Sequence, residues 1–197
     1  LDTWKTLPER EICSGLAETI KHACLADAEF FEYLEAHMEE ILALDQTACE
    51  HIAEKNCSIK YHVVMKDERE TGLREVLNLG HTVGAVETVS EYRLLHGEAV
   101  AIGLAAEVRL SQKMGYMTDA QAERVIALLK RAKLPTEIPL YIDREKLVKK
   151  LYTDKKVRDG KLRFVVQNGI GEIVCFGENV YATPVSEETA REIIMQL

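Results

Sequence analysis

The sequence predicts a mainly helical fold, a helical bundle domain with one small β-hairpin near the C-terminus. Two observations lead to this prediction. Apolar residues recur at intervals of three and four through most of the chain, which is the period of an amphipathic helix. Near the C-terminus, two short runs rich in Val, Ile and Phe, at 162–166 and 172–176, flank the hairpin-type dipeptide Asn168-Gly169. The length of 197 residues suits one domain with a sizeable core, so we take 1–197 as a single domain.

Helix boundaries follow from prolines and capping residues. Pro8 precedes a predicted helix over 9–25, and further helices are expected over 28–44 and 46–66. Pro135 ends a later helix. Side chains that cap helix N-termini precede five of the predicted helices: Asp27, Asp45, Thr118 (in a capping box with Gln121), Asp143 and Ser186.

A helix of a different character is predicted to start at His96. The run 99–106 contains no polar side chain, so a helix here should be buried on nearly all sides. Gly115 is a suitable C-terminal stop. We therefore expect a buried helix with a histidine at its mouth.

A set of polar residues precedes that helix. Arg74, Asn78 and His81 stand at i, i+4 and i+7, so they share one face if the segment is helical. Gly80 and Gly84 are four apart, and another backbone could approach closely there. A plain core helix would avoid such a polar face, which indicates a site.

Two histidines and one acidic residue are the candidate site residues. His81 and His96 each stand beside a glycine and suggest metal ligation, although a separated pair of histidines is more often structural. Glu18 and Lys21 are three apart and share a face of the first helix, and their spacing alone favours a surface ion pair. On the residues alone, both alternatives stay open.

The composition argues against several classes of function. The net charge of −8 makes nucleic acid and an acidic membrane surface poor partners, so we expect neither. No run is long or apolar enough to span a bilayer, and residues 1–11 show no targeting pattern. Five cysteines without a CxxC pair indicate reduced thiols and a cytoplasmic location. No GxGxxG or Walker sequence is present.

Four segments together resemble a known enzyme family. SGLAETIKHACL, KDERETGLREVLNLGHTVG, LHGEAVAIG and DKK…GKLRFV have the order and rough spacing of 3-dehydroquinate synthase, across nearly the whole chain. The chain resembles the C-terminal helical domain of that enzyme. The resemblance implies that the family's N-terminal NAD-binding α/β domain is absent from this chain, which also lacks an initiator methionine.

The resemblance implies a zinc (or cobalt) site. The family's ligands come from its GxAExxK, GHT and LHGE motifs, which correspond here to Glu18, His81 and His96. Two imidazoles and one carboxylate would leave open positions on the ion for substrate hydroxyls. The ion would lower the pKa of the hydroxyl that NAD oxidises.

The resemblance also assigns substrate and cofactor contacts. The substrate carries a carboxylate and a phosphate, for which Arg and Lys are the expected partners. Positions that match the family's substrate pocket are Lys21, Lys60, Glu70, Arg74 and Asn78, and Lys155 or Lys156 matches a lysine that contacts phosphate. A segment that touches NAD at the domain junction matches Thr3, Trp4, Lys5 and Thr6.

The implied activity is that of a carbon–oxygen lyase of the shikimate pathway. The family converts 3-deoxy-arabino-heptulosonate 7-phosphate to 3-dehydroquinate and phosphate, through oxidation by NAD, phosphate elimination, reduction and ring closure. We expect the intact parent protein to perform this reaction as a cytoplasmic homodimer. The 197-residue chain alone should bind the metal without turning over substrate.

One departure from the family pattern bears on activity. The family reads GHT-x-G-H-A-x-E, with a second histidine one turn after the zinc ligand, whereas positions 80–87 read GHTVGAVE. Ala85, Val86 and Glu87 match the residues after that histidine, so a one-residue deletion fits better than a substitution. A deletion within a helix would rotate the downstream residues by about 100°, unless the loop before His96 absorbs the rotation.

Two alternative functions therefore stand beside the first. One is a related sugar-phosphate cyclase that uses another seven- or six-carbon phosphate, although Arg74 and Asn78 favour a carboxylated substrate. The other is a non-catalytic metal-binding domain, because the missing imidazole belongs near the transferred phosphate in the family.

Overall fold

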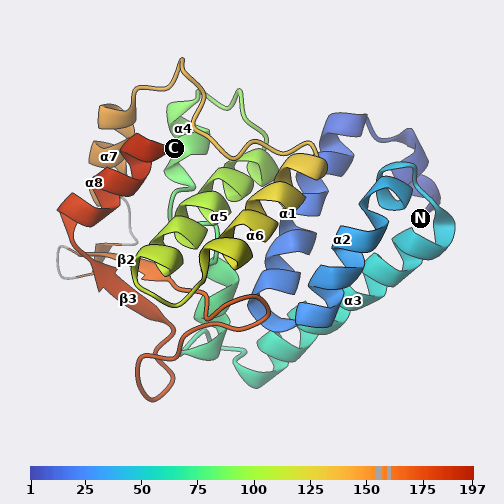
Figure 1. The fold of residues 1–197 in the computed structure, drawn as a ribbon, viewed down its shortest axis with the longest axis horizontal. Helices are drawn as coiled ribbons and strands as arrows, with labels where there is room; N and C mark the ends of the chain where they lie inside the picture. Colours follow the sequence, from blue (N-terminus) through green and yellow to red (C-terminus); the bar gives the residue numbers. More distant parts are fainter. Residues whose placement is uncertain (154–156, 159–160) are drawn as a thin grey trace.

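Helix α5 (His96–Lys113) lies near the middle of the molecule and packs against both α1 and α6 (Figure 1). The computed structural model describes residues 1–153, 157–158 and 161–197. The other elements, in chain order, are the 3-10 helix η1 (Asp2–Thr6), α1 (Glu9–Ala26), α2 (Ala28–Leu42), α3 (Gln46–Lys66), the 3-10 helix η2 (Leu73–Asn78), α4 (Ala85–Val89), α6 (Asp119–Arg131), α7 (Arg144–Thr153), β1 (Val157–Arg158), β2 (Lys161–Val165), β3 (Ala182–Val185) and α8 (Glu187–Gln196). The predicted helical domain with a small β-structure near the C-terminus is confirmed.

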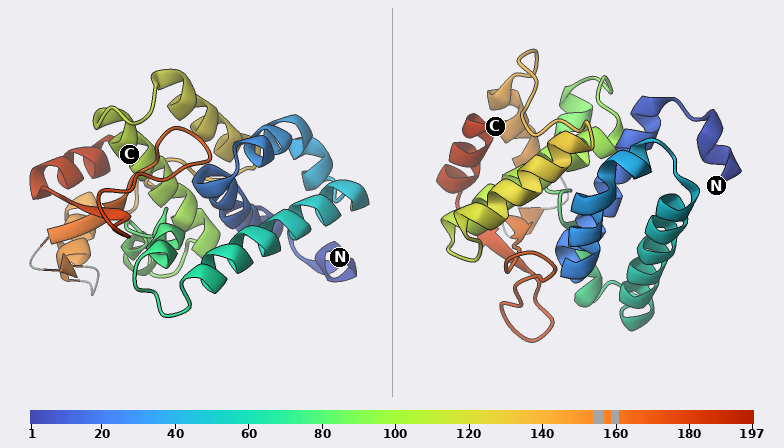
Figure 2. Two further views of the ribbon diagram at one scale, coloured as in Figure 1. Left: turned by 90° about the horizontal axis from the view of Figure 1, so that it is seen from below. Right: turned by 45° about the vertical axis from the view of Figure 1, so that its right-hand side comes forward.

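Helix α5 is buried because it separates two hydrophobic clusters. Val100, Leu104 and Val108 join the cluster formed with α1, α2, α3 and α6. Ile102 and Leu110 join the second cluster, which is formed with α4, α7, β2 and α8. Figure 2 shows α2 and α3 as an antiparallel pair on the side of α1 that faces away from the sheet. The predicted burial of 99–106 on nearly all sides is confirmed.

The predicted caps are present. Asp27 accepts a hydrogen bond from the Phe30 N–H, and Asp45 accepts one from the Ala48 N–H. The capping box, the Asp143 cap and the Ser186 cap also form. In the described ranges, no helix combines the length and apolar character needed to cross a membrane.

The β-structure is a three-stranded antiparallel sheet in the order β1-β2-β3, with Val157 opposite Leu162 and Leu162 opposite Val185. The predicted hairpin across Asn168-Gly169 forms only in part. Gln167 bridges Ile173, and the Val174 N–H donates to the Val166 carbonyl, but 172–176 is not a strand that pairs with β2. After the Asn168-Gly169 turn, the Gly171 N–H donates to the Cys24 carbonyl at 2.9 Å. The chain thus contacts the end of α1 here, and β3, not 172–176, pairs with β2.

The segment from Arg74 to His81 is not one helix, so the predicted shared face is wrong. The 3-10 helix η2 ends at Asn78, and Leu79 is extended with ψ of 131°. Gly80 follows with φ of +78°, in the left-handed region that favours glycine. His81 therefore projects from a turn.

A buried carboxylate organises the turn before η2. Asp67 Oδ1 accepts bonds from the Thr71 N–H (2.8 Å) and hydroxyl (3.0 Å). Its Oδ2 accepts bonds from the Gly72 N–H (2.8 Å) and the Arg74 N–H (2.9 Å). These donors lower the pKa of Asp67 to about 2, and the Arg74 N–H has the largest effect. The turn before η2 is therefore ordered around one of its charges.

Two glycines of α5 let other backbone segments touch the helix. A Cβ on Gly97 would lie 1.9 Å from the Ser14 carbonyl oxygen of α1. A Cβ on Gly103 would lie 1.9 Å from the Gly80 carbonyl oxygen. The predicted close approach is thus confirmed at Gly80. The nearest atom to a Cβ on Gly84 belongs to His81 of the same turn.

Gly103→Ala should destabilise the fold strongly. The added methyl group meets backbone, which cannot move aside as a flexible side chain can, and overpacking of this kind costs about 2–3 kcal/mol or more. Chemical denaturation measures the loss. Gly15→Ala in α1 is the matched control, because its Cβ meets no atom within 4 Å. There we expect a gain of up to about 1 kcal/mol. Equal stability of the two variants would contradict the close contact.

Asp67→Asn should lower the melting temperature at neutral pH, because the amide NH2 would face backbone donors. The pKa of Asp67 is lowered in the folded state, so its stabilisation is present above its unfolded pKa of about 4 and is lost as pH falls towards 2. The difference in melting temperature between wild type and variant should therefore narrow between pH 4 and pH 2.5. A difference that stays constant over that range would rule out the charged acceptor.

Candidate metal centre

Three side chains from separate elements converge at one point. Glu18 comes from α1, His81 from the turn after η2, and His96 from the first position of α5. One ligand atom from each lies within 4.8 Å of the others. Glu18 Oε1 is 3.4 Å from His81 Nε2 and 3.6 Å from His96 Nε2. Folding thus assembles the cluster from residues up to 78 positions apart (96 − 18).

The spacing of these atoms fits a small divalent cation. Ligands held at about 2.0–2.1 Å from a tetrahedral ion lie about 3.3–3.4 Å apart. The two distances from the Glu18 oxygen are close to that value. Two imidazoles and one carboxylate suit zinc or cobalt and leave coordination positions open. The site is also accessible, since the His96 side chain is 58% exposed.

Hydrogen bonds to the other ring nitrogens orient both histidines. His81 Nδ1 lies 3.0 Å from the Leu79 carbonyl oxygen. Because a carbonyl can only accept, Nδ1 carries the proton and Nε2 presents its lone pair towards Glu18. His96 Nδ1 lies 3.3 Å from Glu87 Oε2, a carboxylate that favours the same tautomer.

Lys21 completes the centre from the opposite side of Glu18. Its Nζ is 2.5 Å from Glu18 Oε2 and donates to the Leu77 carbonyl at 3.1 Å. Spacing alone favoured a surface ion pair, but the Lys21 side chain is only 4% exposed. Burial lowers the pKa of Lys21, and Glu18 partly offsets this. Burial raises the pKa of Glu18, but Lys21 and then His81 outweigh it, so the net pKa is lowered.

The first turn of α5 is tied to α1 on both sides of Gly97. The Gly97 N–H donates to Ser14 Oγ at 3.0 Å. Arg10 binds both oxygens of Glu98, at 2.7 and 2.6 Å, and also the Arg93 carbonyl. Glu98 Oε2 also accepts the Leu95 N–H. These bonds fix His96 opposite Glu18.

The structure places the other predicted substrate residues outside the three-ligand cluster. Asn78 and Glu70 line a cleft of about 190 Å³ that also contains Arg163. Lys60 is exposed on α3, and its charge contributes to the lowered pKa of Lys21. Arg74 donates to the Glu68 carbonyl at 3.0 Å. Lys155 and Lys156 lie outside the described residues.

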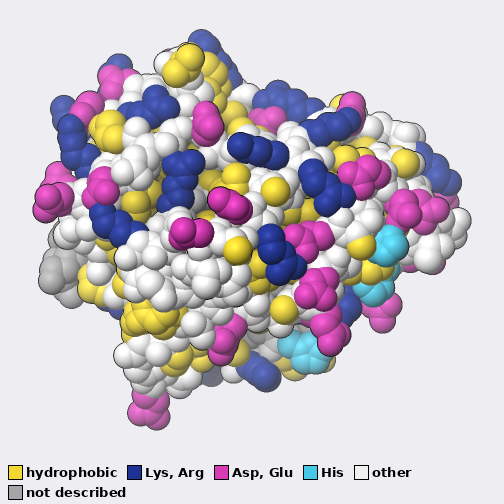
Figure 3. Space-filling model, in the orientation of Figure 1, with side chains coloured by type: hydrophobic (Ala, Val, Ile, Leu, Met, Phe, Trp, Pro, Cys, Tyr) yellow, Lys and Arg dark blue, Asp and Glu magenta, His cyan; other side chains and the backbone are white. Residues whose placement is uncertain are grey.

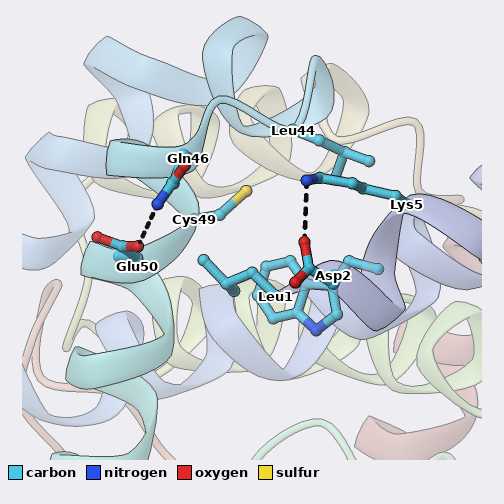
Figure 4. A pocket seen from close by; sticks show the side chains of 8 residues that line it. Leu1, Asp2, Lys5, Leu44, Gln46, Cys49 and Glu50 are labelled. Atoms are coloured by element: carbon cyan, nitrogen blue, oxygen red, sulfur yellow. Dashed lines mark hydrogen bonds and ion pairs between the residues drawn. The ribbon is translucent and has the colours of Figure 1, made fainter.

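The predicted cofactor residues, Thr3 to Thr6, form most of η1. Trp4 and Lys5 line a separate pocket. Leu44, from the connection before α3, and the α3 residues Gln46, Cys49 and Glu50 also line it (Figure 4). Lys5 pairs there with Asp2 at 3.0 Å. Their contact with NAD stays a prediction.

The structure accommodates the shortened GHT motif. Val83, Ala85 and Val86 are buried in the second hydrophobic cluster, and α4 begins only at Ala85. The loop before α5 then reverses through Glu91 and Tyr92, which have φ of 56° and 59°. That loop brings His96 back to Glu18, so the expected rotation does not separate the ligands.

Three further residues around the centre were not found from the sequence. Glu87 binds His96, and Arg163 lines the cleft with Asn78. Glu107 lies with no exposed surface on α5 and accepts the Gly80 N–H. Its only sequence signal was an acidic residue directly after the apolar run 99–106.

Known proteins resemble the chain in sequence. The sequence profile of the 3-dehydroquinate synthase C-terminal family matches residues 15–157. The 3-dehydroquinate synthase of Ruminiclostridium cellulolyticum is 42% identical over 174 residues, which cover 88% of this chain and 48% of that protein. The chloroplastic 3-dehydroquinate synthase of Solanum lycopersicum is 45% identical over 193 residues, covering 96% and 43%. The chain thus spans about half the length of these curated relatives.

Solved structures share the fold. The 2-epi-5-epi-valiolone synthase of Streptomyces hygroscopicus, solved with NAD+ and Zn2+ bound, has a TM-score of 0.83 and 26% identity over 97% of this chain and 52% of that one. A 2-deoxy-scyllo-inosose synthase, solved with carbaglucose-6-phosphate, NAD+ and Co2+, has a TM-score of 0.86 at 22% identity, covering 97% and 53%. From the profile match and from relatives more than 40% identical, the chain belongs to the 3-dehydroquinate synthase C-terminal family.

Proposed function

We propose that this chain is the metal- and substrate-binding part of a 3-dehydroquinate synthase. The full-length protein would convert 3-deoxy-arabino-heptulosonate 7-phosphate to 3-dehydroquinate and phosphate. The observation that carries the proposal is the convergence of Glu18, His81 and His96, with oriented imidazoles and ligand-like spacing. The names of the sequence relatives support the choice of reaction.

Each residue of the centre has a task in this proposal. Glu18, His81 and His96 hold the cation, while Lys21 keeps the Glu18 carboxylate ionised and turned towards it. A bound zinc or cobalt ion would supply a Lewis acid that makes a substrate hydroxyl more acidic. Asn78, Glu70 and Arg163 offer polar contacts in the 190 Å³ cleft, and Arg163 is suited to an anionic group.

Turnover is proposed for the full-length protein, because the curated relatives are about twice as long as the matched segment. We propose that Thr3 to Thr6 touch NAD and that Lys155 or Lys156 contacts the phosphate group. The homodimer and the cytoplasmic location also stay predictions.

On the face in Figure 3, basic and acidic side chains are interspersed, in keeping with ion pairs such as Arg124–Glu35 and Arg131–Glu39.

Two observations favour alternatives. The solved structures with the same fold are a 2-epi-5-epi-valiolone synthase and a 2-deoxy-scyllo-inosose synthase, the latter in complex with carbaglucose-6-phosphate, so a related sugar phosphate is the second candidate substrate. Apolar Val83, Ala85 and Val86 occupy the turn after His81, where the family has an additional histidine, which favours a non-catalytic metal-binding domain.

Zinc content should depend on each of the three ligands. We expect about one ion per chain in the wild type and nearly none in His81→Ala, His96→Ala and Glu18→Gln. A site with three protein ligands loses most of its metal affinity when one ligand is removed. Elemental analysis after dialysis measures this, with circular dichroism to verify folding. His62→Ala is the control, because His62 is exposed on α3 and bonds its own helix at Ser58. Unchanged zinc in the three variants would contradict the assignment.

Comparing turnover of two sugar phosphates distinguishes the proposed substrate from that of a related cyclase. The full-length protein should release phosphate from the heptulosonate phosphate and form 3-dehydroquinate, and should leave glucose 6-phosphate unchanged, because Arg74 and Asn78 suit a carboxylated substrate. Turnover of glucose 6-phosphate alone would favour the related cyclase. Normal zinc content without turnover of either compound would favour the non-catalytic domain.

A further inference from the structure

Glu107 is a buried acidic residue outside the three-ligand cluster. It lies on α5 with no exposed surface, between Ala106 and Val108, which are also fully buried. A carboxylate is costly to remove from water unless hydrogen bonds compensate it. Its hydrogen-bonding partner therefore indicates what it does.

One partner is the backbone of the GHT turn. The Gly80 N–H donates to Glu107 Oε2, across 27 residues of sequence. The carbonyl of the same glycine packs against Gly103, one turn earlier on α5, where a Cβ would lie 1.9 Å from the oxygen. Helix α5 thus holds both polar atoms of Gly80.

The hold on Gly80 matters because His81 follows it directly. Glycine has the widest conformational range of any residue, so a turn built on it needs an external anchor to stay in one conformation. The His81 ring is within 3.0 Å of the Leu79 carbonyl and 3.4 Å of Glu18. Both contacts depend on where the Gly80 peptide points.

We propose that Glu107 is a positioning residue of the metal centre. Its carboxylate fixes the Gly80 N–H and thereby presents His81 Nε2 to the cation. The role in metal binding rests on the proposed function, whereas the Glu107–Gly80 bond exists without it. A glutamine at this position has the reach and an acceptor oxygen, so it should preserve the turn, whereas an alanine has neither.

Zinc affinity of the full-length protein, measured by competition with a chromophoric chelator, tests the role. We expect Glu107→Ala to weaken binding about 10- to 100-fold, as loss of an outer partner of a metal ligand does. Glu107→Gln should restore it to within about threefold of wild type. Ser111→Ala is the matched control: Ser111 is also fully buried on α5, but its hydroxyl binds the Glu107 carbonyl and the Gln167 N–H. We expect wild-type zinc affinity there, even if the melting temperature falls.

Wild-type affinity in Glu107→Ala would overturn the inference, as would a Gln variant as weak as the Ala variant. If Glu107→Ala does not fold, amide hydrogen exchange of the wild-type protein provides the test. The Gly80 amide should exchange far more slowly than that of Arg69 in its exposed turn, and equal rates would overturn the inference. A wild type that binds no zinc contradicts the proposed function itself, whereas normal zinc in both wild type and Glu107→Ala contradicts only the role of Glu107.

Discussion

The centre depends on close backbone contact along one helix. At Gly97 the backbone of α1 touches α5, and at Gly103 the turn before His81 does so. The first contact brings Glu18 to α5, and the second brings His81. His96 is the first residue of α5. The positions of all three side chains are therefore set by the same helix. Hydrophobic packing on both sides of α5 holds the helix in place.

The polar network depends on that packing. Once the backbones are in contact, few atoms remain that can satisfy the buried polar groups. The Ser14 hydroxyl accepts the Gly97 N–H, and Glu107 accepts the Gly80 N–H. Hydrogen bonds that would be weak in water are stronger here, because the groups cannot exchange them for solvent.

Local features of the fold could be predicted from the sequence, and long-range ones could not. Capping by Asp27 and Asp45 depends on residues three positions away, so the sequence displays it directly. The partner of β2 is β3, which follows a long connection, and no local pattern encodes that pairing. The break after Asn78 was missed because the 3-10 helix η2 and the turn at Gly80 depend on Asp67 and Glu107.

The candidate site shows the same division. His81 and His96 suggested a metal on their own, but Glu18 could be added as the third ligand only through family motifs, because the spacing of the three carries no ligand pattern. The burial of Lys21 was not visible, since a pair three residues apart has the same spacing at the surface and in the core. Glu87 reaches His96 through a loop with two left-handed residues, a geometry that residue types alone do not specify.

The sharing of Glu18 between Lys21 and the two imidazoles has an electrostatic consequence. One carboxylate oxygen already faces an ammonium group, so the negative charge is largely neutralised before any cation arrives. A divalent ion seated beside the other oxygen would leave the cavity with a surplus of positive charge. Anions would then be attracted to the loaded form more than to the empty one, and by reciprocity an anion in the cleft would tighten retention of the ion.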